Sequence, residues 1–476
     1  MTLLLGVPAC GLASFTCLRF TPLRWNLVLA LALIGSPFAP LPAAGAVLGI
    51  LLALRFGGGD SGKRSAVLHG RRPALDERGL AIGSDERGRL ARIPLRDRSG
   101  AHTLVVGATG SGKTVTEAWI VARAVERGHG AVIVDPKGDP LLLETARGAA
   151  QLAGREFVEW TPNGPAIYNP YGHGGPSEIA DKALAGESFS EPHYLRQAQR
   201  YLSHAARALS ATGETATPRR LLELMDPREL EQVARKLSDG AHARTLFAYL
   251  DSLDARQRAG LAGTRDRLAI LAESELGRWL DPSGRGQTVD LLAAIRRRAV
   301  VYFCLEADRL PLLARMLAAA IVQDLLTVAA DCQHSPVPTL VAIDEFSGVS
   351  AAGVARLFGR ARAAGFSLLL ATQELADLRA AGDELLEQVL GNVETVVAHR
   401  QSVPDSAELV ARIAGTRVVW SKTEQLSHGF ATGRATRTRG REYVIHPDAI
   451  KALAPGTAAV AVASAGTCVV AQIFHP

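Results

Sequence analysis

A short glycine-rich loop carries the clearest chemistry in this chain. Residues 107–114 read Gly-Ala-Thr-Gly-Ser-Gly-Lys-Thr, which fits the pattern G-x-x-x-x-G-K-[ST] of a phosphate-binding loop. In such a loop, backbone N–H groups and the N-terminus of the following helix face the phosphates of a nucleotide. Lys113 is expected to reach the β- and γ-phosphates, and the Thr114 hydroxyl is expected to bind Mg²⁺. The predicted nucleotide-binding residues are Gly107, Ala108, Thr109, Gly110, Ser111, Gly112, Lys113 and Thr114.

The residues on either side of the loop favour this interpretation over a surface turn with an incidental lysine. Residues 102–106 predict a buried strand, and residues 115–125 place apolar side chains on one face of a helix that ends at Gly128. Residues 57–63 match part of the same pattern, but Arg64 follows them in place of a hydroxyl residue and no strand precedes them. We interpret residues 57–63 as part of a flexible linker.

Two acidic residues follow an apolar run much later in the chain. Residues 340–343 predict a buried parallel strand, and Asp344 and Glu345 come at its carboxyl end, where ligands bind in such sheets. Asp344 is expected to hold Mg²⁺ through its water shell, and Glu345 is expected to act as the general base toward the attacking water. The alternative is a strand that ends in an acidic, solvated turn.

Two further side chains are candidates for the same chemistry. Gln373 follows the predicted strand 367–370 and is a candidate γ-phosphate sensor, although a glutamine at a strand end is also a common solvated cap. Arg362 lies near the end of a predicted helix and is a candidate arginine finger for the nucleotide of a neighbouring subunit. An arginine at a helix C-terminus also suits the helix dipole, so both interpretations stay open.

Alternating strands and helices indicate an α/β core with a mostly parallel sheet. Residues 80–95 predict a hairpin that turns near Gly88, and residues 131–134 predict the strand after the phosphate loop. Strand signals vanish between about 176 and 286, where amphipathic helices dominate, and they resume at 299–305. We therefore expect an all-helical domain inserted into one nucleotide-binding core.

The N-terminal part of the chain is strongly apolar. Residues 2–18 and 25–54 contain no charged residue, which predicts a membrane anchor of one or two spans. Basic residues follow Leu54, so the positive-inside rule places the rest of the chain in the cytoplasm. The net charge of +6 suits either a polyanionic partner or a membrane-anchored protein. The five cysteines are scattered and predict neither a zinc site nor a disulfide framework.

Taken in order, these motifs resemble the coupling proteins of conjugative type IV secretion systems. The resemblance implies a RecA-like, ATP-hydrolysing motor that forms a hexameric ring at the inner membrane and moves DNA with its attached relaxase toward the secretion channel. It also implies that an arginine of residues 359–365 acts in trans, which favours Arg362 and leaves Arg360 and Arg400 as competitors. The resemblance rests on the anchor, the phosphate loop, Asp135-Pro-Lys-Gly138, Tyr168-Asn-Pro170, the inserted helices, Ile343-Asp-Glu345 and Ala371-Thr-Gln373.

The same resemblance places Asp135 and Lys137 at the border of the nucleotide, although a structural turn is an adequate explanation for both. It also identifies residues 392–395 as the start of the next core strand. The predicted fold is α/β: a RecA-like P-loop NTPase core with an inserted all-α domain and an N-terminal transmembrane anchor. The predicted division is an anchor at 1–56, a basic linker at 57–75, the nucleotide-binding domain at 76–175 and 287–476, and the all-α domain at 176–286.

The nucleic-acid contacts are the least determined feature of the sequence. Residues 433–441 hold four arginines and no acidic residue, and we weigh a flexible segment that contacts DNA phosphates against a solvated loop between strands. Two alternatives to a DNA translocase stay open: a secretion ATPase acting on protein substrates, and a membrane docking receptor that binds ATP without turnover. Glu345 argues against the receptor, because binding alone needs no general base.

Overall fold

The computed structural model describes residues 73–75, 79–187, 189, 191–284, 286–346, 351–382, 384–427 and 430–476. The predicted anchor at 1–56 lies outside these residues, as does most of the predicted linker at 57–75. Among the described residues, one helix is long and apolar enough to cross a membrane, α15 (Pro311–Cys332), and 83% of its most apolar window is buried inside the protein. That degree of burial is typical of a core helix.

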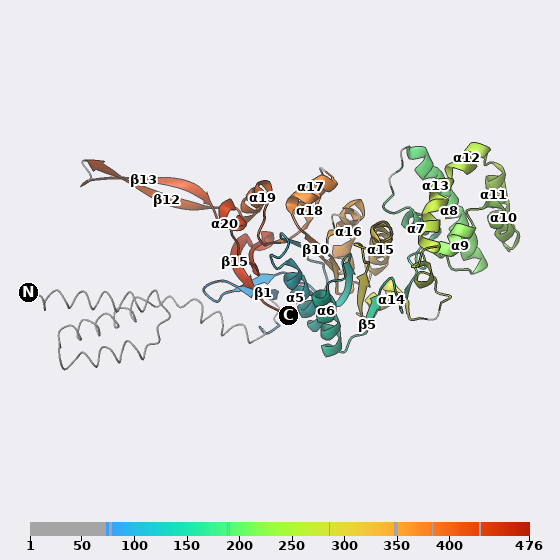
Figure 1. Cartoon of the computed structure of the whole chain (residues 1–476), viewed down its shortest axis with the longest axis horizontal. Coiled ribbons are helices and arrows are strands. Elements are labelled where there is room, and N and C mark those ends of the chain that lie inside the picture. Colours follow the sequence, from blue (N-terminus) through green and yellow to red (C-terminus); the bar gives the residue numbers. More distant parts are fainter. Residues whose placement is uncertain are drawn as a thin grey trace, which may run out of the picture. The chain divides into compact units, whose positions relative to one another are not determined.

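An 11-stranded mixed sheet forms the centre of the described chain (Figure 1). Seven neighbouring strands, from β11 to β5 in the order below, are parallel, and the remaining four form an antiparallel edge. The order is β2 (Leu90–Ile93), β1 (Leu80–Ser84), β15 (Thr467–Ile473), β14 (Thr457–Val462), β11 (Thr395–Ala398), β3 (Thr103–Val106), β10 (Phe366–Thr372), β9 (Thr339–Ile343), β4 (Gly130–Asp135), β8 (Val300–Cys304) and β5 (Phe157–Trp160).

Helices cover both faces of this sheet because its parallel strands are apolar on both sides. In β3, for example, Val105 packs with the helices of one face, whereas Leu104 and Val106 pack with the helices of the other. The first face is covered by α5 (Lys113–Glu126) and α6 (Pro140–Leu152). The second is covered by α14 (Leu291–Arg296), α15, α16 (Ala351–Ala364), α17 (Leu375–Ala381), α18 (Leu385–Asn392), α19 (Pro404–Ala414) and α20 (Pro447–Lys451).

The helices between β6 (Ile167–Tyr168) and β7 (Thr288–Val289) pack around a buried cluster of their own. Several of them begin with a proline in the first turn, and Thr217 caps α9 by accepting a hydrogen bond from the backbone N–H of Arg220. These helices are α7 (Pro176–Ala183), α8 (Pro192–Thr212), α9 (Pro218–Glu223), α10 (Pro227–Arg235), α11 (Gly240–Asp251), α12 (Ala255–Gly260) and α13 (Ala262–Ala272). The 3₁₀ helix η1 (Gly277–Trp279) follows them, and its Trp279 packs against the core of the α/β sheet.

A buried ion pair links the first of these helices to the α/β core. Lys182 of α7 and Asp324 of α15 are 0% and 2% exposed, and the Lys182 ammonium donates to Asp324 Oδ1 over 2.6 Å. The Tyr168 hydroxyl donates to the other carboxylate oxygen over 2.8 Å. The Asp324 carboxylate therefore holds together α7, α15 and the Tyr-Asn-Pro segment that the sequence analysis identified.

The structure differs from the sequence prediction at two segments, 433–441 and 392–395. Residues 433–441, predicted as a flexible or solvated loop, belong to β13 (Phe430–Tyr443), which pairs with β12 (Thr416–Ser427) in a two-stranded sheet. Arg437, Arg439 and Arg441 stand at every second position, which is the two-residue period of a strand, but the glycines and charges of the segment concealed it. The predicted strand at 392–395 is shorter than expected, because Asn392 ends α18 and β11 begins at Thr395.

Candidate nucleotide site

The phosphate loop connects β3 to α5 and leaves the start of α5 open. Gly112, the residue before α5, has φ 106°, a left-handed conformation that suits glycine. No side chain caps α5 and no acidic residue lies in its first turn. The first N–H groups of a helix have no partner within the helix, so this terminus is available to an anion.

Close packing behind the loop explains Gly107. A Cβ atom on Gly107 would lie 2.4 Å from Ser111 Oγ and 2.7 Å from His399 Cβ, which is too close for either contact. His399 is fully buried, and its Nδ1 lies 3.1 Å from the carbonyl oxygen of Thr457. A carbonyl only accepts, so Nδ1 carries the proton and Nε2 accepts from the Thr116 hydroxyl over 2.7 Å. His399 thus supports α5 from behind as a neutral imidazole.

Two buried histidines are expected to make the fold sensitive to acid. Burial lowers the pKa of His399 to about 4, and burial together with the Arg362 charge lowers the pKa of His102 to about 4. As the pH falls, the unfolded chain takes up protons first, so the free energy of unfolding decreases between about pH 6.5 and pH 4. By pH 5 the loss is expected to be about 2 kcal/mol per histidine. Urea unfolding at pH 7 and pH 5 measures it, and His399→Gln should lose less stability over that range than the unaltered protein; an equal loss would contradict this assignment.

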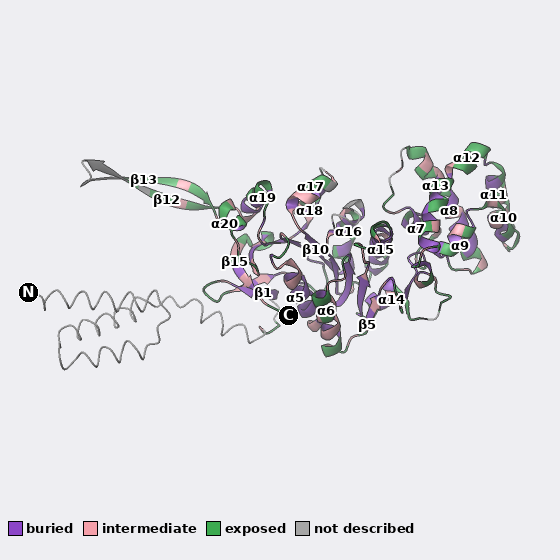
Figure 2. Cartoon of the chain, in the orientation of Figure 1, coloured by how far each residue is buried: buried purple, intermediate pink, exposed green. Residues whose placement is uncertain are grey.

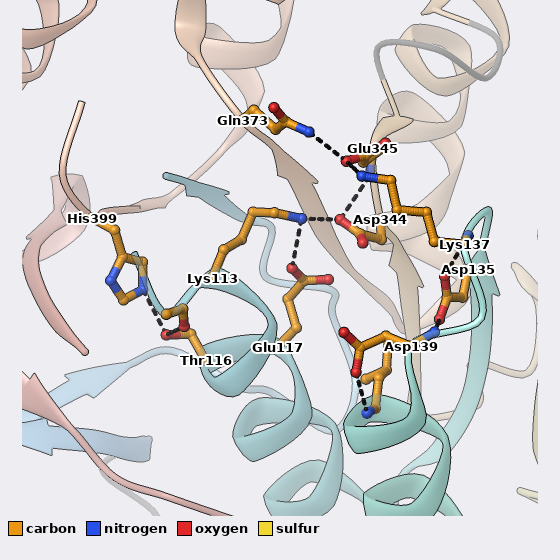
Figure 3. Close-up of polar contacts among 12 residues, drawn as sticks. Lys113, Thr116, Glu117, Asp135, Lys137, Asp139, Asp344, Glu345, Gln373 and His399 are labelled. Carbon is orange, nitrogen blue, oxygen red and sulfur yellow. Dashed lines mark hydrogen bonds and ion pairs between the residues drawn. The ribbon is translucent and has the colours of Figure 1, made fainter. Parts of the chain in front are cut away.

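Lys113 lies between two carboxylates at the carboxyl edge of the sheet (Figure 3). Its ammonium pairs with Asp344 Oδ1, and Glu117 Oε1, one helical turn further along α5, lies 3.3 Å away. Burial opposes the charge on Lys113, but Glu117 and Asp344 outweigh it and raise the lysine pKa. Burial and the neighbouring Asp344 raise the pKa of Glu117 well above its usual range, because one ammonium serves two carboxylates. Burial also raises the pKa of Asp344.

Glu345 is held by a lysine and a glutamine (Figure 3). Its Oε1 accepts from Lys137 Nζ over 2.5 Å and from Gln373 Nε2 over 2.8 Å. Burial alone would raise the pKa of Glu345, but these two hydrogen bonds lower it below its usual value, so the side chain is ionised at neutral pH. Its backbone has φ 45°, an uncommon conformation for a non-glycine residue that is found most often at functional sites. The turn after β9 thus aims a carboxylate at Gln373, at the end of β10.

The buried Asp135 side chain fixes the turn at residues 136–139. It is fully buried, and its carboxylate accepts the backbone N–H groups of Lys137 and Gly138 over 2.8 Å and of Asp139 over 2.7 Å. The Tyr302 hydroxyl donates to the same carboxylate. These donors occupy the oxygens of Asp135, so it fixes the turn that presents Lys137, and Lys137 alone of the two lines the cavity.

These side chains surround one cavity. Every residue predicted to bind nucleotide lines it except Ser111, and Asp344, Glu345 and Gln373 line it as well. Backbone N–H groups and Lys113 suit an anionic phosphate, and the carboxylates of Asp344 and Glu345 suit a hard cation or a water molecule. The residues present therefore fit a nucleotide with Mg²⁺. The buried Ser111 hydroxyl, which has no described hydrogen-bond partner, lies in the same loop.

The structure adds residues that the sequence reasoning missed. Glu117, Thr116 and His399 were not predicted, and the contact between Lys137 and Glu345 was not foreseen. Glu117 could have been predicted from the sequence, because an acidic residue four positions after Lys113 lies on the same helix face and interrupts an apolar pattern. The role of His399 could not have been predicted from the sequence, because its contact with Thr116 joins residues 283 positions apart.

Comparison with known protein families identifies two segments of the chain. Residues 87–142 match the family described as "Type IV secretion-system coupling protein DNA-binding domain", and residues 338–455 match "TraM recognition site of TraD and TraG". The chain belongs to the type IV coupling-protein family. The first match contains the phosphate loop and Lys137, and the second contains Asp344, Glu345 and Gln373, so the cavity of this coupling protein is built from both. A search of curated proteins found no match.

Solved structures show the same fold. TrwBdeltaN70, a bacterial conjugative coupling protein in an unbound monoclinic form, is 18% identical, with a TM-score of 0.64 over 86% of this chain and 91% of that one. Plasmid coupling protein TrwB in complex with ADP and Mg²⁺ is 18% identical, with a TM-score of 0.61 over 87% and 92%. VirB4 of Thermoanaerobacter pseudethanolicus is 14% identical, with a TM-score of 0.52 over 85% and 98%.

The three candidate arginines of the coupling protein do not line its own cavity. Arg362, in the last turn of α16, donates to the carbonyl oxygen of Asn392 over 2.7 Å. Arg360 is exposed on the same helix. Arg400 contacts the phosphate loop through its backbone, where its carbonyl oxygen accepts the N–H of Ala108 over 3.0 Å. None of the three arginines is among the residues that line the cavity.

Proposed function

We propose that this coupling protein is a membrane-anchored ATPase that couples ATP hydrolysis to the movement of DNA, with its attached relaxase, toward a type IV secretion channel. The observation that supports it most is the cavity in which the phosphate loop, Asp344, Glu345 and Gln373 meet. The similarity of TrwB, whose structures contain ADP with Mg²⁺, supports the same nucleotide and ion here. In this proposal the helices at 176–286 form a separate domain, the core is RecA-like, residues 1–56 anchor it in the inner membrane, and six copies form a ring.

The resting contacts define what the chain's own residues do. Asp344 and Glu117 pair with the Lys113 ammonium; Lys113 would contact the phosphates of a bound triphosphate, and Asp344 would hold Mg²⁺. Bound Mg²⁺ would neutralise charge that develops on the β- and γ-phosphate oxygens. Glu345 accepts a proton from the attacking water, and Gln373, which already donates to Glu345, orients that water.

The contact between Lys137 and Glu345 weakens Glu345 as a base. While Lys137 Nζ holds Glu345 Oε1, that oxygen is a weak base, and a phosphate near the loop offers Lys137 a competing partner. Because Lys137 is 43% exposed, it is free to turn toward such a partner.

Hydrolysis measured with and without DNA tests the proposal. The full-length protein in lipid nanodiscs is expected to hydrolyse ATP faster with DNA, to lose that stimulation as salt rises, and to lose all hydrolysis in Lys113→Ala. Hydrolysis that ignores DNA would favour the protein-secretion ATPase instead. Nucleotide binding without any turnover in the assembled protein would favour the docking receptor.

Arg362 is expected to act on a neighbouring subunit. Arg362→Ala should reduce turnover by about 10³-fold or more while nucleotide affinity changes little, because a finger stabilises charge in the transition state. Mixing Arg362→Ala with an excess of Glu345→Gln protein should restore activity, since each supplies what the other lacks. Arg360→Ala, on the same helix, tests the competing candidate and should leave turnover unchanged if Arg362 is the finger. Mixtures that stay inactive would remove the support for a trans role.

A further inference from the structure

The hairpin β12–β13 has one face that is basic and one that is not. Cross-strand partners lie on the same face of a two-stranded ribbon, so Val418 and Trp420 share a face with their partners Arg441 and Arg439. Arg437 lies two residues before Arg439 and is therefore on this face too. We call Val418, Trp420, Arg437, Arg439 and Arg441 the arginine face.

The arginine face is exposed along its described length (Figure 2). Trp420 is 61% exposed and Val418 is 43% exposed. Within the described residues, β12 and β13 hydrogen-bond only to each other, so no third strand extends this sheet. Because the Trp420 side chain is exposed, its burial does not stabilise the fold, and a large exposed aromatic side chain often marks a binding surface.

The positive charges of the arginine face are arranged in a line. Arginines at every second position of a strand lie about 7 Å apart, so Arg437, Arg439 and Arg441 form a row along this face. The opposite face differs, because there Arg417 is paired in register with Glu442. Repeated like charge on one face destabilises a hairpin, and an isolated two-stranded hairpin is only marginally stable. The β12–β13 hairpin keeps three arginines on one face despite this repulsion.

Trp420 lies among these arginines. The Arg437 guanidinium is 5.9 Å from the centroid of the Trp420 ring, and Arg439 is the cross-strand partner of Trp420. Guanidinium groups bind phosphates through two parallel hydrogen bonds, and an exposed aromatic ring stacks on bases. A straight row of guanidinium groups with a stacking ring complements a linear polyanion that carries bases.

We propose that the arginine face of the β12–β13 hairpin binds the phosphate backbone of a nucleic acid strand, with Trp420 stacking on a base. This inference deepens the proposed function by naming a surface that contacts the transported DNA. It does not depend on ATP turnover, because the contact is one of binding alone.

Oligonucleotide binding across a salt series tests the proposal. The probes are fluorescein-labelled single-stranded and duplex DNA, and the protein is the full chain in detergent without nucleotide. Replacing Arg437, Arg439 and Arg441 together by alanine is expected to make the slope of log affinity against log salt shallower, by about 2 for single strands and about 3 for duplex. ATP hydrolysis without DNA should not change, because these arginines lie outside the nucleotide cavity.

Matched single variants separate this face from general charge. Arg439→Ala should make the slope shallower by about 0.7 to 0.9, whereas Arg417→Ala, on the opposite face of the same hairpin, should leave it unchanged. Oligonucleotide should quench tryptophan fluorescence in the unaltered protein and quench it less in Trp420→Phe, a test that does not require removing any charge.

Three results would overturn the proposal. One is an unchanged salt slope in the triple variant, and another is an equal effect of Arg417→Ala and Arg439→Ala. The third is loss of binding to phosphatidylserine vesicles in the triple variant with DNA binding intact, which would assign the face to a membrane surface. If hydrolysis proves indifferent to DNA while the arginine variants weaken DNA binding as expected, the proposed motor fails but this site stands.

Discussion

Replacing Glu345 with glutamine is expected to slow ATP turnover by about 10²–10⁴-fold while nucleotide still binds. The glutamine keeps the size of the side chain and can still accept the hydrogen bond from Gln373, but it cannot take a proton from water. Glu345 is the carboxylate at the end of β9 that lines the cavity and faces Gln373. Steady-state hydrolysis, together with the affinity for a fluorescent ATP analogue, measures the two effects separately.

Glu374→Gln is the matched control for this prediction. Glu374 follows Gln373, the donor to Glu345, but lies outside the cavity lining, and its Oε1 accepts the backbone N–H of Ser402 over 2.8 Å. A glutamine retains that acceptor, so turnover should change no more than a few-fold. Glu345→Gln protein that keeps more than a tenth of normal turnover would show that another group acts as the base.

Replacing Asp324 with alanine is expected to destabilise the protein by about 3–5 kcal/mol. The change leaves the Lys182 ammonium buried without its carboxylate and removes the acceptor of the Tyr168 hydroxyl. Urea unfolding of the full-length protein measures the loss. Because the pair joins α7 to α15, the helices between β6 and β7 should lose their attachment to the core at lower urea than in the unaltered protein.

The controls for Asp324 come from the same cluster. Asp331, on the same helix, is half-exposed and contacts His173 Nε2 over 2.9 Å, so Asp331→Ala should cost less than about 1 kcal/mol. Replacing Lys182 and Asp324 together with apolar residues of similar size should recover much of the loss. A cost below 1 kcal/mol for Asp324→Ala would mean that the pair is not what holds α7.

The elements around the site were predictable because each is strongly patterned. The apolar runs at 102–106, 340–343 and 367–370 correspond to β3, β9 and β10, which are neighbours in the sheet. Since parallel strands present their carboxyl ends at one edge, Lys113, Asp344 and Gln373 had to meet once those strands were recognised. The hairpin at 80–95 is confirmed as β1 and β2, with its turn at 85–89.

Contacts that depend on packing were not predictable from the pattern. The imidazole of His399 behind the phosphate loop and the hold of Lys137 on Glu345 arise from side chains on elements far apart in sequence. The β12–β13 hairpin was missed for a different reason. Its strand alternates arginine with threonine and lacks an apolar face, so the usual signal of a half-buried strand is absent.

Movement of DNA itself is the most direct test of the proposed motor. The full-length protein in nanodiscs is given DNA that carries streptavidin on a terminal biotin, and the rate of streptavidin release is followed with and without ATP. ATP-dependent release that disappears in both Lys113→Ala and Glu345→Gln is the predicted result. Release no faster than in Lys113→Ala, while ATP hydrolysis continues, would show that the energy of hydrolysis does not move DNA.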